Sequence, residues 1–524
     1  MGRWRERQRS YPGRPVGYAK GIGNLYREIQ PSQQESAEAI VLLREEGLNM
    51  KRGKEPMSST ERRRKQKIPK GGCPEPEAMN TEKVEGAPSF SGARIGDDPH
   101  GEEYQLMEKV VERENMKAAL KRVERNKGAP GIDGRRTEEL KAYLSKNWSG
   151  IKEMLLNGTY KPTPVRRVEI PKPDGGKRTL GIPIVVDRLI QQALLQVLTP
   201  IFDPGFSDSS YGFRPQRSAH QAVRRARSYT EEGYEWVADI DLEKFFDKVN
   251  HDMLMARVAR KVKDKRVLRL IRAYFTVGIM TEGVVVRVEA GTPQGGPISP
   301  LLANILLDDL DKELEKRGHK FVRYADDCNI YVRSERAGKR VMESVGKFVE
   351  KKLRLKVNRK KSGVDKTHKR KILGFSFYGV KRPRIRFASK TLQRFKERVR
   401  KLTRRTWGIS TEERLEYMNR YFTGWINYFH LVDTPGTLER LDKWIRKRLR
   451  MCILKQWKEP KTRRRKLITL GVPREEVHLI SASRRGCWHL ANCKWVNIAL
   501  GPSYWKELGL ISLAERYSIL RGVS

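Results

Sequence analysis

The chain has 524 residues, a formal net charge of +46 and a pI near 10.2, so it is long enough for two to four domains and favours a polyanionic partner. We take that partner to be nucleic acid. No stretch approaches the ~20 apolar residues that a membrane span needs, and residues 1–20 lack the apolar core of a secretory signal.

The N-terminal fifth of the chain differs in composition from the rest. Residues 1–100 are rich in Pro, Gly, Ser, Glu and Arg, which predicts a mostly disordered, basic and polar extension. We hypothesise that it is an accessory tail, or translated sequence ahead of an internal start such as Met79. A helical pattern then begins near Tyr104 and continues to Val123, so we expect a helical segment over residues 101–160.

A basic hairpin is predicted next. Two extended pieces flank the turn Asp174-Gly175-Gly176, which leaves Lys172 and Arg178 near its tip. An arginine can meet phosphate oxygens as a planar fork and a lysine as a point charge. The alternative for any such cations in a chain this basic is a solvated surface.

Acids alternate with apolar residues between Trp236 and Leu242. The period of two places Trp236, Ala238, Ile240 and Leu242 on one face of a strand. Asp239 and Asp241 fall on the opposite face. We expect one face to pack inward and the other to present carboxylates to a cleft.

A glycine-rich segment, 291–304, precedes a predicted helix. Its glycines allow a close approach of the backbone to a nucleotide or template, and Ser299 can cap a helix that has Pro300 at its first position. The helix is expected to run to about Arg317 and to end at Gly318. Its buried stripe is predicted to comprise Leu302, Ile305 or Leu306, Leu310 and Leu314.

The segment Tyr324-Ala325-Asp326-Asp327 is predicted to be a tight turn between apolar strands. Two adjacent carboxylates raise one pKa or require a counter-cation, and Mg²⁺ suits paired carboxylates in phosphate chemistry. Taken alone, Asp-Asp is also an ordinary turn signal. Together with Asp241, the pair supplies acids on two neighbouring strands, which can hold the two ions, about 4 Å apart, of nucleotidyl transfer.

These motifs, in their order and spacing, resemble the palm of a reverse transcriptase, specifically the group II intron-encoded reverse transcriptase and maturase family. The matching segments are 241–246, 291–304 and 324–327. The resemblance implies an α+β right-hand polymerase, with fingers and a palm built on antiparallel sheet over residues 161–380. A helical thumb/maturase domain would follow over residues 381–470, and a basic nucleic-acid-binding region over residues 471–524.

The resemblance also implies roles for single residues. Asp241, Asp326 and Asp327 would be catalytic, and with Leu242 they would form the site of two Mg²⁺ ions. The implied nucleotide-binding residues are Lys172, Arg178, Phe246, Gln294 and Lys361. Phe246 would exclude a 2′-hydroxyl, although ordinary core packing is an alternative, and Lys361 would approach the pyrophosphate, although a solvated lysine is the alternative.

Two further segments resemble known parts of the family. Residues 126–134 resemble the loop that lids the template, and residues 372–377 resemble the hairpin that grips the primer.

The C-terminal part combines aromatic and basic residues. Tyr417, Tyr421, Phe422, Trp425, Tyr428 and Phe429 recur at helical spacing, which predicts packing in a helical bundle. The string 419–429 nevertheless resembles the maturase domain that grips intron RNA. Residues 381–524 hold 34 Lys and Arg and 12 Asp and Glu, a net charge of +22. The candidate RNA- or DNA-binding residues are Arg446, Lys447, Arg448, Arg463, Arg464 and Arg465.

The last feature of the sequence is the number and spacing of its cysteines. Five scattered cysteines do not form a disulfide framework and suit a reducing, here bacterial, cytoplasm. Cys487, His489 and Cys493 lack a second pair, so we do not expect zinc there. The metal-binding endonuclease module of some family members is also not expected. The resemblance then implies insertion with a primer from elsewhere, such as a nascent strand at a replication fork.

The expected function is RNA-directed DNA synthesis by a protein that also binds its group II intron RNA. The implied partners are that RNA, an RNA template with a DNA primer, target DNA and deoxynucleoside triphosphates; a homodimer stays open. Splicing and mobility by target-primed reverse transcription would follow. The rival hypotheses are an RNA-folding cofactor whose polymerase fold is a relic, a polymerase that makes RNA, and a repurposed enzyme. The presence of all three aspartates favours the DNA-synthesising enzyme.

Overall fold

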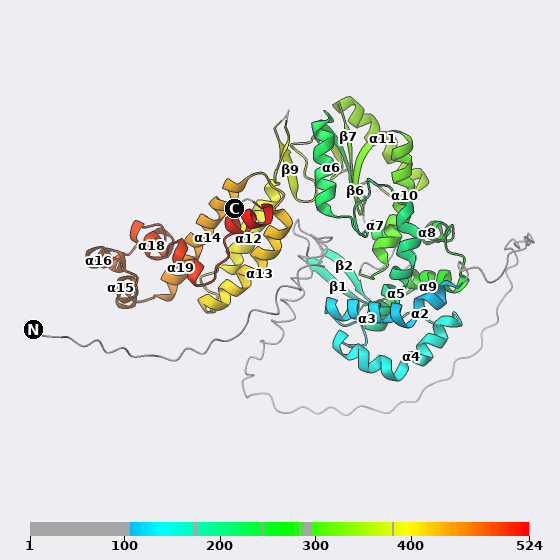
Figure 1. Cartoon of the computed structure of the whole chain (residues 1–524), viewed down its shortest axis with the longest axis horizontal. Helices are drawn as coiled ribbons and strands as arrows, with labels where there is room; N and C mark the ends of the chain where they lie inside the picture. Colours follow the sequence, from blue (N-terminus) through cyan, green and yellow to red (C-terminus); the bar gives the residue numbers. More distant parts are fainter. Residues whose placement is uncertain are drawn as a thin grey trace, which may run out of the picture. The chain divides into compact units, whose positions relative to one another are not determined.

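The computed structural model describes residues 105–171, 177–243, 245–281, 284–286, 295–379 and 382–522. These residues divide into two compact units, which we describe separately (Figure 1). The first unit comprises the described residues of 203–245 and 303–522, and the second those of 105–202 and 246–302. The predicted N-terminal extension, residues 1–100, lies outside the described residues.

The second unit combines helices with a small mixed sheet. Its helices are α2 (Leu106–Val111), α3 (Arg113–Asn126), α4 (Leu140–Leu156), α5 (Val185–Phe202), α8 (His251–Val258) and α9 (Lys265–Thr276). Its strands, in the order β2-β1-β4-β5, are β2 (Lys177–Ile182), β1 (Val165–Pro171), β4 (Ile279–Thr281) and β5 (Val284–Val286). The predicted hairpin is confirmed by the antiparallel β1–β2 pair, but β1 pairs with β4 in parallel. The hairpin tip, 174–176, lies outside the described residues.

The single helical pattern expected between Tyr104 and Val123 is two helices. Glu112 separates them with an extended backbone, φ −58° and ψ 140°. The Asn115 side-chain amide donates to the Val110 carbonyl at 2.8 Å and to the Ala193 carbonyl of α5 at 3.3 Å. The break therefore satisfies a carbonyl at the end of α2 and ties the two helices to α5.

The loop that follows α3 is fixed against the start of α5. Lys127 ends α3 with a positive φ of 44°. The Arg188 guanidinium donates to the carbonyls of Ala129 and Pro183. A Cβ atom at Gly131 would lie 2.6 Å from the Ile184 Cα, so only glycine fits this approach. The loop that we predicted as a template lid is thus a braced element of the second unit.

The first unit is built around a four-stranded antiparallel sheet of order β6-β7-β3-β8. The strands are β3 (Trp236–Ile240), β6 (Lys320–Tyr324), β7 (Asp327–Val332) and β8 (Gly363–Lys366). Helix α6 (Ala219–Glu231) contacts β6 and β7, and α11 (Glu335–Lys352) contacts β3, β7 and β8 (Figure 1). Helix α10 (Ser299–Lys316) ends before Gly318, as predicted, and its predicted apolar stripe is buried.

Two expectations for this sheet need correction. The β3 strand ends at Ile240, one residue before Asp241, and Leu242 forms only an isolated bridge with Val357. The face that carries Asp239 and Asp241 is also not open along its length, because Val237 and Tyr331 are buried on it. Helices α6 and α11 pack on the sheet, and the side chain of Asp239 within β3 is only 21% exposed.

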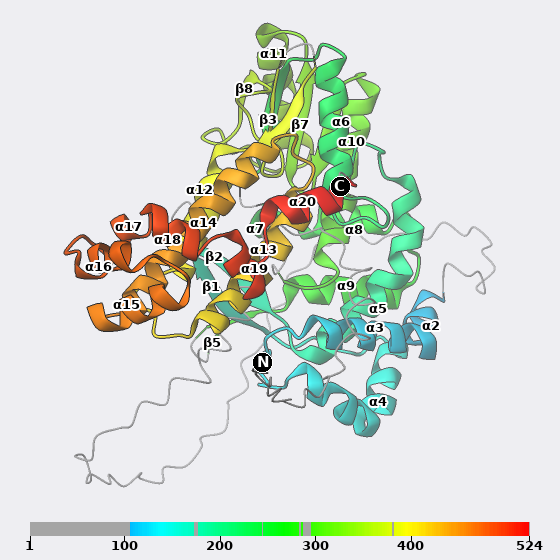
Figure 2. The ribbon, with the colours of Figure 1, turned by 60° about the vertical axis from the view of Figure 1, so that its left-hand side comes forward.

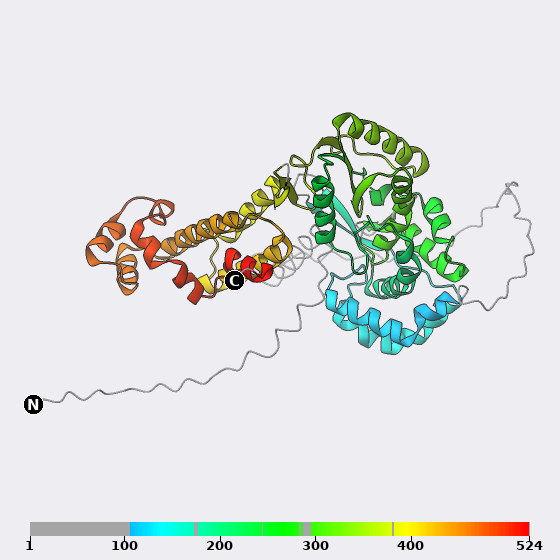
Figure 3. The same cartoon turned by 45° about the horizontal axis from the view of Figure 1, so that its top comes forward.

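A second hairpin and a helical bundle complete the first unit. Strands β9 (Phe375–Tyr378) and β10 (Arg384–Phe387) pair antiparallel, where the primer-gripping hairpin was predicted. The helices that follow are α12 (Ser389–Leu402), α13 (Thr411–Phe429), α14 (Pro435–Gln456), α15 (Pro460–Thr469), α16 (Arg474–Ala482), α17 (Cys487–Leu490), α18 (Lys494–Ala499), α19 (Pro502–Glu507) and α20 (Leu513–Arg521). Figure 3 shows this long helical region beyond β10. The predicted α+β class, with a helical C-terminal region, is confirmed.

The aromatic stripe of α13 forms the core of this bundle, as predicted. The Trp425 ring lies 4.3 Å from the Phe395 ring of α12 and stacks at 5.1 Å on Phe387 of β10. The C-terminal helix α20 packs on α13 and α14 (Figure 2). The buried Asp442 carboxylate of α14 accepts the N–H groups of Leu513 and Ala514 at 3.0 Å and so fixes the start of α20. Among the described helices, none combines the length and the apolar character that crossing a membrane requires.

A buried carboxylate in the second unit generates a prediction for pH dependence. Asp187 of α5 accepts hydrogen bonds from the Tyr160 and Tyr274 hydroxyls and from the Thr163 N–H. Burial raises the pKa of Asp187 to about 6, although these hydrogen bonds lower it. Because the folded-state pKa is raised, the stability that protonated Asp187 contributes is complete below the unfolded pKa of about 4 and is lost as the pH rises through about 6.

We therefore expect Asp187→Asn to become more stable relative to the wild type as the pH rises from about 4 to about 8. The free energy of unfolding of the variant should rise relative to that of the wild type by up to about 3 kcal/mol, at roughly 1.4 kcal/mol per unit of pKa shift. Urea unfolding at both pH values measures it. A gain that is the same at both values would show that Asp187 is already ionised in the folded protein throughout this range.

Candidate active site

The β6–β7 hairpin carries adjacent acids on a two-residue turn. Tyr324 pairs with Asp327, which leaves Ala325 and Asp326 as the turn residues. Ala325 has a φ of 57°, the left-handed conformation that two-residue hairpin turns require and that residues other than Gly, Asn and Asp adopt reluctantly. A Cβ atom at Gly212 would lie only 2.4 Å from the Ala325 N atom. The turn is therefore pressed against the backbone of the preceding segment.

The strand register brings Asp241 to the same end of the sheet. In the β3–β7 pair, Ala238 lies opposite Ile330 and Ile240 opposite Cys328. Asp241 directly follows Ile240 and Asp327 directly precedes Cys328, so both acids lie at this end of the β3–β7 pair. Asp241 and Asp326 are half-buried, and Asp327 is exposed. The three predicted catalytic acids thus converge on one sheet end.

A loop that precedes β8 anchors Asp241 through its backbone. The Asp241 N–H donates to the Ser362 Oγ at 2.9 Å, and the Asn358 N–H donates to the Asp241 carbonyl at 2.8 Å. The Glu243 N–H donates to the Lys356 carbonyl at 2.8 Å. These bonds flank the Leu242–Val357 bridge, so the Leu242 carbonyl does not pair with Val357 and faces the β7 edge. That edge is where Asp327 lies.

Two cations accompany the acids of β3. The Lys361 Nζ lies 3.9 Å from the Asp241 Oδ1 and is 62% exposed, so this ion pair is weak and its ammonium is accessible. The Arg370 guanidinium lies 3.6 Å from the Asp239 carboxylate. Burial raises the pKa of Asp239 to about 6, with Arg370 opposing and Asp241 adding to the shift. Lys361 thus lies beside the predicted catalytic acid Asp241, and Arg370 offsets the charge of Asp239.

The donor chemistry at this sheet end fits magnesium. Three carboxylates and the Leu242 carbonyl are hard oxygen ligands, which Mg²⁺ prefers. Within the described ranges, no three His, Cys, Asp or Glu side chains are already gathered closely enough to hold a metal ion, and this includes the region of Cys487 and Cys493.

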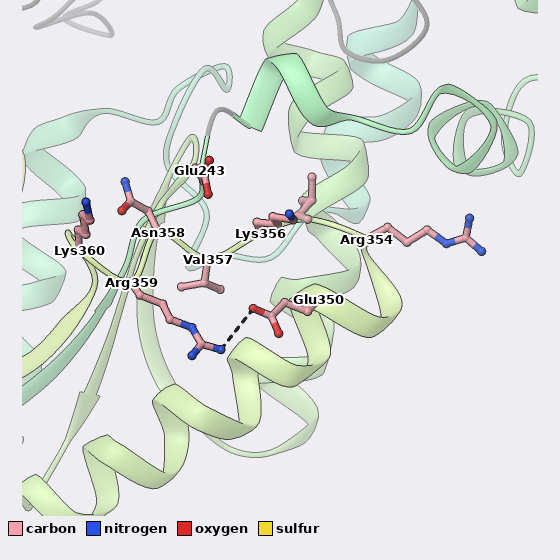
Figure 4. A pocket seen from close by; sticks show the side chains of 9 residues that line it. Glu243, Glu350, Arg354, Lys356, Val357, Asn358, Arg359 and Lys360 are labelled. Carbon is pink, nitrogen blue, oxygen red and sulfur yellow. Dashed lines mark ion pairs between the residues drawn. The ribbon is translucent and has the colours of Figure 1, made fainter. Parts of the chain in front are cut away.

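An open cleft of about 970 Å³ lies beside this site and is lined by Glu243, Glu350, Arg354, Leu355, Lys356, Val357, Asn358, Arg359 and Lys360. Figure 4 shows Lys356, Asn358 and Arg359 around it, with Arg359 reaching toward Glu350 at 4.0 Å. The loop that anchors Asp241 is therefore also the wall of a basic depression.

The predicted nucleotide-binding residues are only partly placed. Lys172 and Gln294 lie outside the described residues. Arg178 pairs with Ile170 in the β1–β2 hairpin, and its side chain is not described. Phe246 is half-buried in the short helix α7 (Phe245–Lys248).

The predicted RNA-binding cations of α14 are half-buried, and one of them is a structural residue. The Arg448 Nε donates to the Thr403 Oγ1 at 2.5 Å, and its Nη2 donates to the Thr403 carbonyl at 3.3 Å. Burial lowers the pKa of Arg448. Lys447 lies over the Trp488 ring at 4.4 Å. Arg448 therefore also braces Thr403, and its assignment as an RNA-binding residue stays a prediction.

The predicted RNA-binding arginines of α15 are likewise partly half-buried and partly exposed. Arg463 is half-buried and reaches the Ser481 carbonyl at 3.5 Å. Arg464 is exposed and contacts the His478 Nδ1 at 2.9 Å, and Arg465 is exposed. Of the three predicted arginines of this run, Arg464 and Arg465 face solvent, as do Lys461 and Lys466.

Sequence reasoning missed a buried polar group beneath the hairpin turn. Arg323, Asp311, Asn304 and Ser210 are buried and bonded to one another. One signal was present: Asn304 and Asp311 are seven residues apart, two helical turns, inside a helix predicted to be apolar on its inner face.

Two family models match the chain. One, described as reverse transcriptase (RNA-dependent DNA polymerase), matches residues 170–377. The other, described as group II intron, maturase-specific domain, matches residues 392–469. The first includes all three aspartates, and the second includes the whole of α13, α14 and α15.

Curated relatives resemble part of the chain. Protein YkfC of Escherichia coli is 38% identical over 226 residues, which are 42% of this chain and 59% of YkfC. The group II intron-encoded protein LtrA of Lactococcus lactis is 38% identical over 199 residues, which are 38% of this chain and 33% of LtrA. The chain thus spans less than two thirds of the length of either relative. A solved partial Cas6-RT-Cas1--Cas2 complex is 26% identical, with a TM-score of 0.31, over 47% of this chain and 42% of that chain.

The anchoring of Asp241 gives a prediction for Ser362→Ala. This change leaves the partly buried Asp241 N–H without its acceptor, which costs about 1 kcal/mol or more. We expect a lower free energy of unfolding, measured with urea. Ser145→Ala is the matched control, because the exposed Ser145 hydroxyl bonds only within its own helix. Equal effects of the two changes would contradict the anchoring role of Ser362.

Proposed function

We propose that this chain copies RNA into DNA and also binds its intron RNA. The proposal proceeds from its membership of the family of group II intron-encoded reverse transcriptases and maturases. The observation that supports the proposal is that Asp241 directly follows β3 at the end of the antiparallel sheet where the turn with Asp326 and Asp327 begins β7. This sheet lies within the part of the chain that resembles reverse transcriptases.

Nucleotidyl transfer at this sheet end follows from the acids. Asp241, Asp326, Asp327 and the Leu242 carbonyl would hold two Mg²⁺ ions, which supply activation of the attacking 3′-oxygen and neutralisation of charge on the leaving pyrophosphate. The backbone bonds from Ser362 and Asn358 keep Asp241 in register with the turn. Lys361 offers an exposed ammonium beside Asp241, where it can contact the triphosphate.

The selection of the substrate is assigned to the other predicted residues. Phe246 would exclude the 2′-hydroxyl of a ribonucleotide, and Gln294 would contact the incoming deoxynucleoside triphosphate. Lys172 and Arg178, at the β1–β2 hairpin, would meet its phosphates. The template would be RNA, and the primer would be DNA, such as a strand of the target.

Intron RNA binding is assigned to the helical C-terminal region. Its surplus of positive charge favours a polyanion, and Arg464 and Arg465 are exposed on α15. Lys447 and Trp488 combine a cation with an exposed ring, a pairing that suits both phosphate and base. We propose that this binding promotes splicing, and that the two activities together promote intron mobility by target-primed reverse transcription.

The catalytic assignment is tested by Asp326→Ala. We expect loss of Mg²⁺-dependent deoxynucleotide addition to a primer on an RNA template, because a metal ligand is removed, with intron RNA affinity nearly unchanged. Primer extension and filter binding measure the two. Asp252→Ala, which removes an exposed carboxylate from α8, is the control and should keep both activities. Undiminished synthesis by Asp326→Ala would overturn the site.

The RNA-binding assignment is tested by changing Arg464 and Arg465 together to Gln. We expect weaker intron RNA binding and a flatter dependence of log K on log salt, by about 0.7 to 0.9 for each phosphate that the variant no longer neutralises. Synthesis on a short template should be kept.

The charge-matched control for this variant changes Lys339 and Lys347 to Gln. Both are exposed on α11 and pair with Glu residues of their own helix. An equal change of the salt slope in the control would show that only net charge matters and would contradict a specific site on α15.

A further inference from the structure

A fully buried ion pair lies directly beneath the turn that carries Asp326 and Asp327. The side chains of Arg323, on β6, and Asp311, on α10, are both 0% exposed. The Arg323 Nε donates to the Asp311 Oδ1 at 2.7 Å, and its Nη2 donates to the Asp311 Oδ2 at 2.6 Å. This is the bidentate geometry that a planar guanidinium makes with a carboxylate.

The remaining donors of Arg323 reach three other residues. Nη1 donates to the Asn304 Oδ1 and to the Ala325 carbonyl, both at 2.9 Å. Nη2 donates to the Ser210 Oγ at 2.7 Å. The guanidinium is therefore fully used, and one of its bonds holds the carbonyl of the residue with the positive φ in the turn.

A second layer of contacts supports the same turn. The Asn304 side-chain amide donates to the Gly212 carbonyl at 2.9 Å. Gly212 is the residue whose missing side chain lets the Ala325 N approach. The Tyr211 N–H donates to the Arg323 carbonyl, and the Arg323 N–H donates to the Ser209 carbonyl, both at 2.9 Å. Segment 209–212, helix α10 and the turn are thus connected through Arg323.

Stability alone does not account for this pair. Removing two charges from water is costly, and well-packed apolar residues of similar volume often replace a buried ion pair without loss of stability. Asp311 and Asn304 also lie on a helix whose Ile305, Leu307 and Leu310 are buried. What apolar side chains cannot provide is a directed set of hydrogen bonds to the Ala325 carbonyl and to Asn304.

We propose that Arg323 and Asp311 are positioning residues that hold the Ala325-Asp326 turn in place, so that Asp326 and Asp327 stand ready for metal ions opposite Asp241. The inference rests on the proposed nucleotidyl transfer and extends it to a group that touches neither metal nor substrate. Two adjacent acids facing a third repel one another, so a turn without rigid support moves its carboxylates apart. Support from packed and bonded neighbours is what keeps such ligands within a fraction of an ångström of a working geometry.

The decisive variant combines Arg323→Met with Asp311→Leu. It replaces the pair by apolar side chains and leaves no unpaired buried charge, so we expect a thermal midpoint close to that of the wild type. We expect kcat for deoxynucleotide addition to fall about 100-fold, since displacing reacting groups by about 1 Å costs that much. The KM for the nucleotide should stay nearly constant, and the Mg²⁺ concentration for half-maximal activity should rise.

A milder variant keeps the inference testable if the double variant does not fold. Ser210→Ala removes one acceptor of Arg323, and Arg323→Lys keeps the charge but loses the planar fork. Both should shift the Mg²⁺ requirement in the same direction as the double variant. Lys312→Met with Asp308→Leu is the matched control, because this pair lies on the same helix with an exposed lysine.

The readouts separate this inference from the proposed function. Mn²⁺ binding, followed by electron paramagnetic resonance in the full chain without nucleotide, reports the ion site independently of synthesis. Weaker Mn²⁺ binding in folded Arg323 and Asp311 variants supports the positioning role, whether or not the wild type extends a primer. A wild type that does not extend a primer would overturn the proposed function alone. Folded variants with wild-type Mn²⁺ affinity and a wild-type Mg²⁺ requirement would overturn the positioning role.

Discussion

The candidate site depends on how a turn with two adjacent acids is held in one conformation. The backbone at Ala325 is left-handed, Gly212 presses against it, and the acids of the turn lie at the same end of the sheet as Asp241, which follows β3. Each of these features opposes folding. The buried Arg323–Asp311 pair lies beneath the turn and stabilises it against all of them. Burial raises the pKa of Asp311, and the neighbouring Arg323 guanidinium, which holds this carboxylate in bidentate bonds, opposes that shift.

The positive charge of the chain performs several different tasks. Some arginines serve the fold: Arg414 and Arg450 are buried and donate to the carbonyls of Leu402 and Ala491. Such bonds satisfy carbonyls that helix ends and loops leave without partners. Others, such as Arg465, are exposed. The net positive charge of the C-terminal region is therefore larger than the charge that it presents to RNA. The exposed cations define the RNA interface better than the total number of cations does.

Much of this architecture could be predicted from sequence, because local patterns determine it. The β6–β7 hairpin, the end of α10 near Gly318 and the aromatic core of α13 follow from alternation, from a glycine and from helical spacing. The break at Glu112 could not be predicted in this way, since it depends on bonds from Asn115 to a distant helix. The partners of Arg323 were missed for the same reason: Ser210 and Asp311 lie on other elements, and an arginine beside an acidic turn resembles a surface residue.

The same network bears on whether the polymerase fold is a relic in a protein that only binds RNA. A binding protein needs the shape of the sheet but not the orientation of two carboxylates at its end. In such a protein, apolar residues at 311 and 323 would preserve the shape without the desolvation of two charges. Here the costly pair is present, its spare donor is directed at the Ala325 carbonyl, and the loop before β8 independently holds the backbone of Asp241. Two unrelated sets of contacts thus fix the two halves of one carboxylate site, which is what metal-dependent catalysis requires and RNA binding does not.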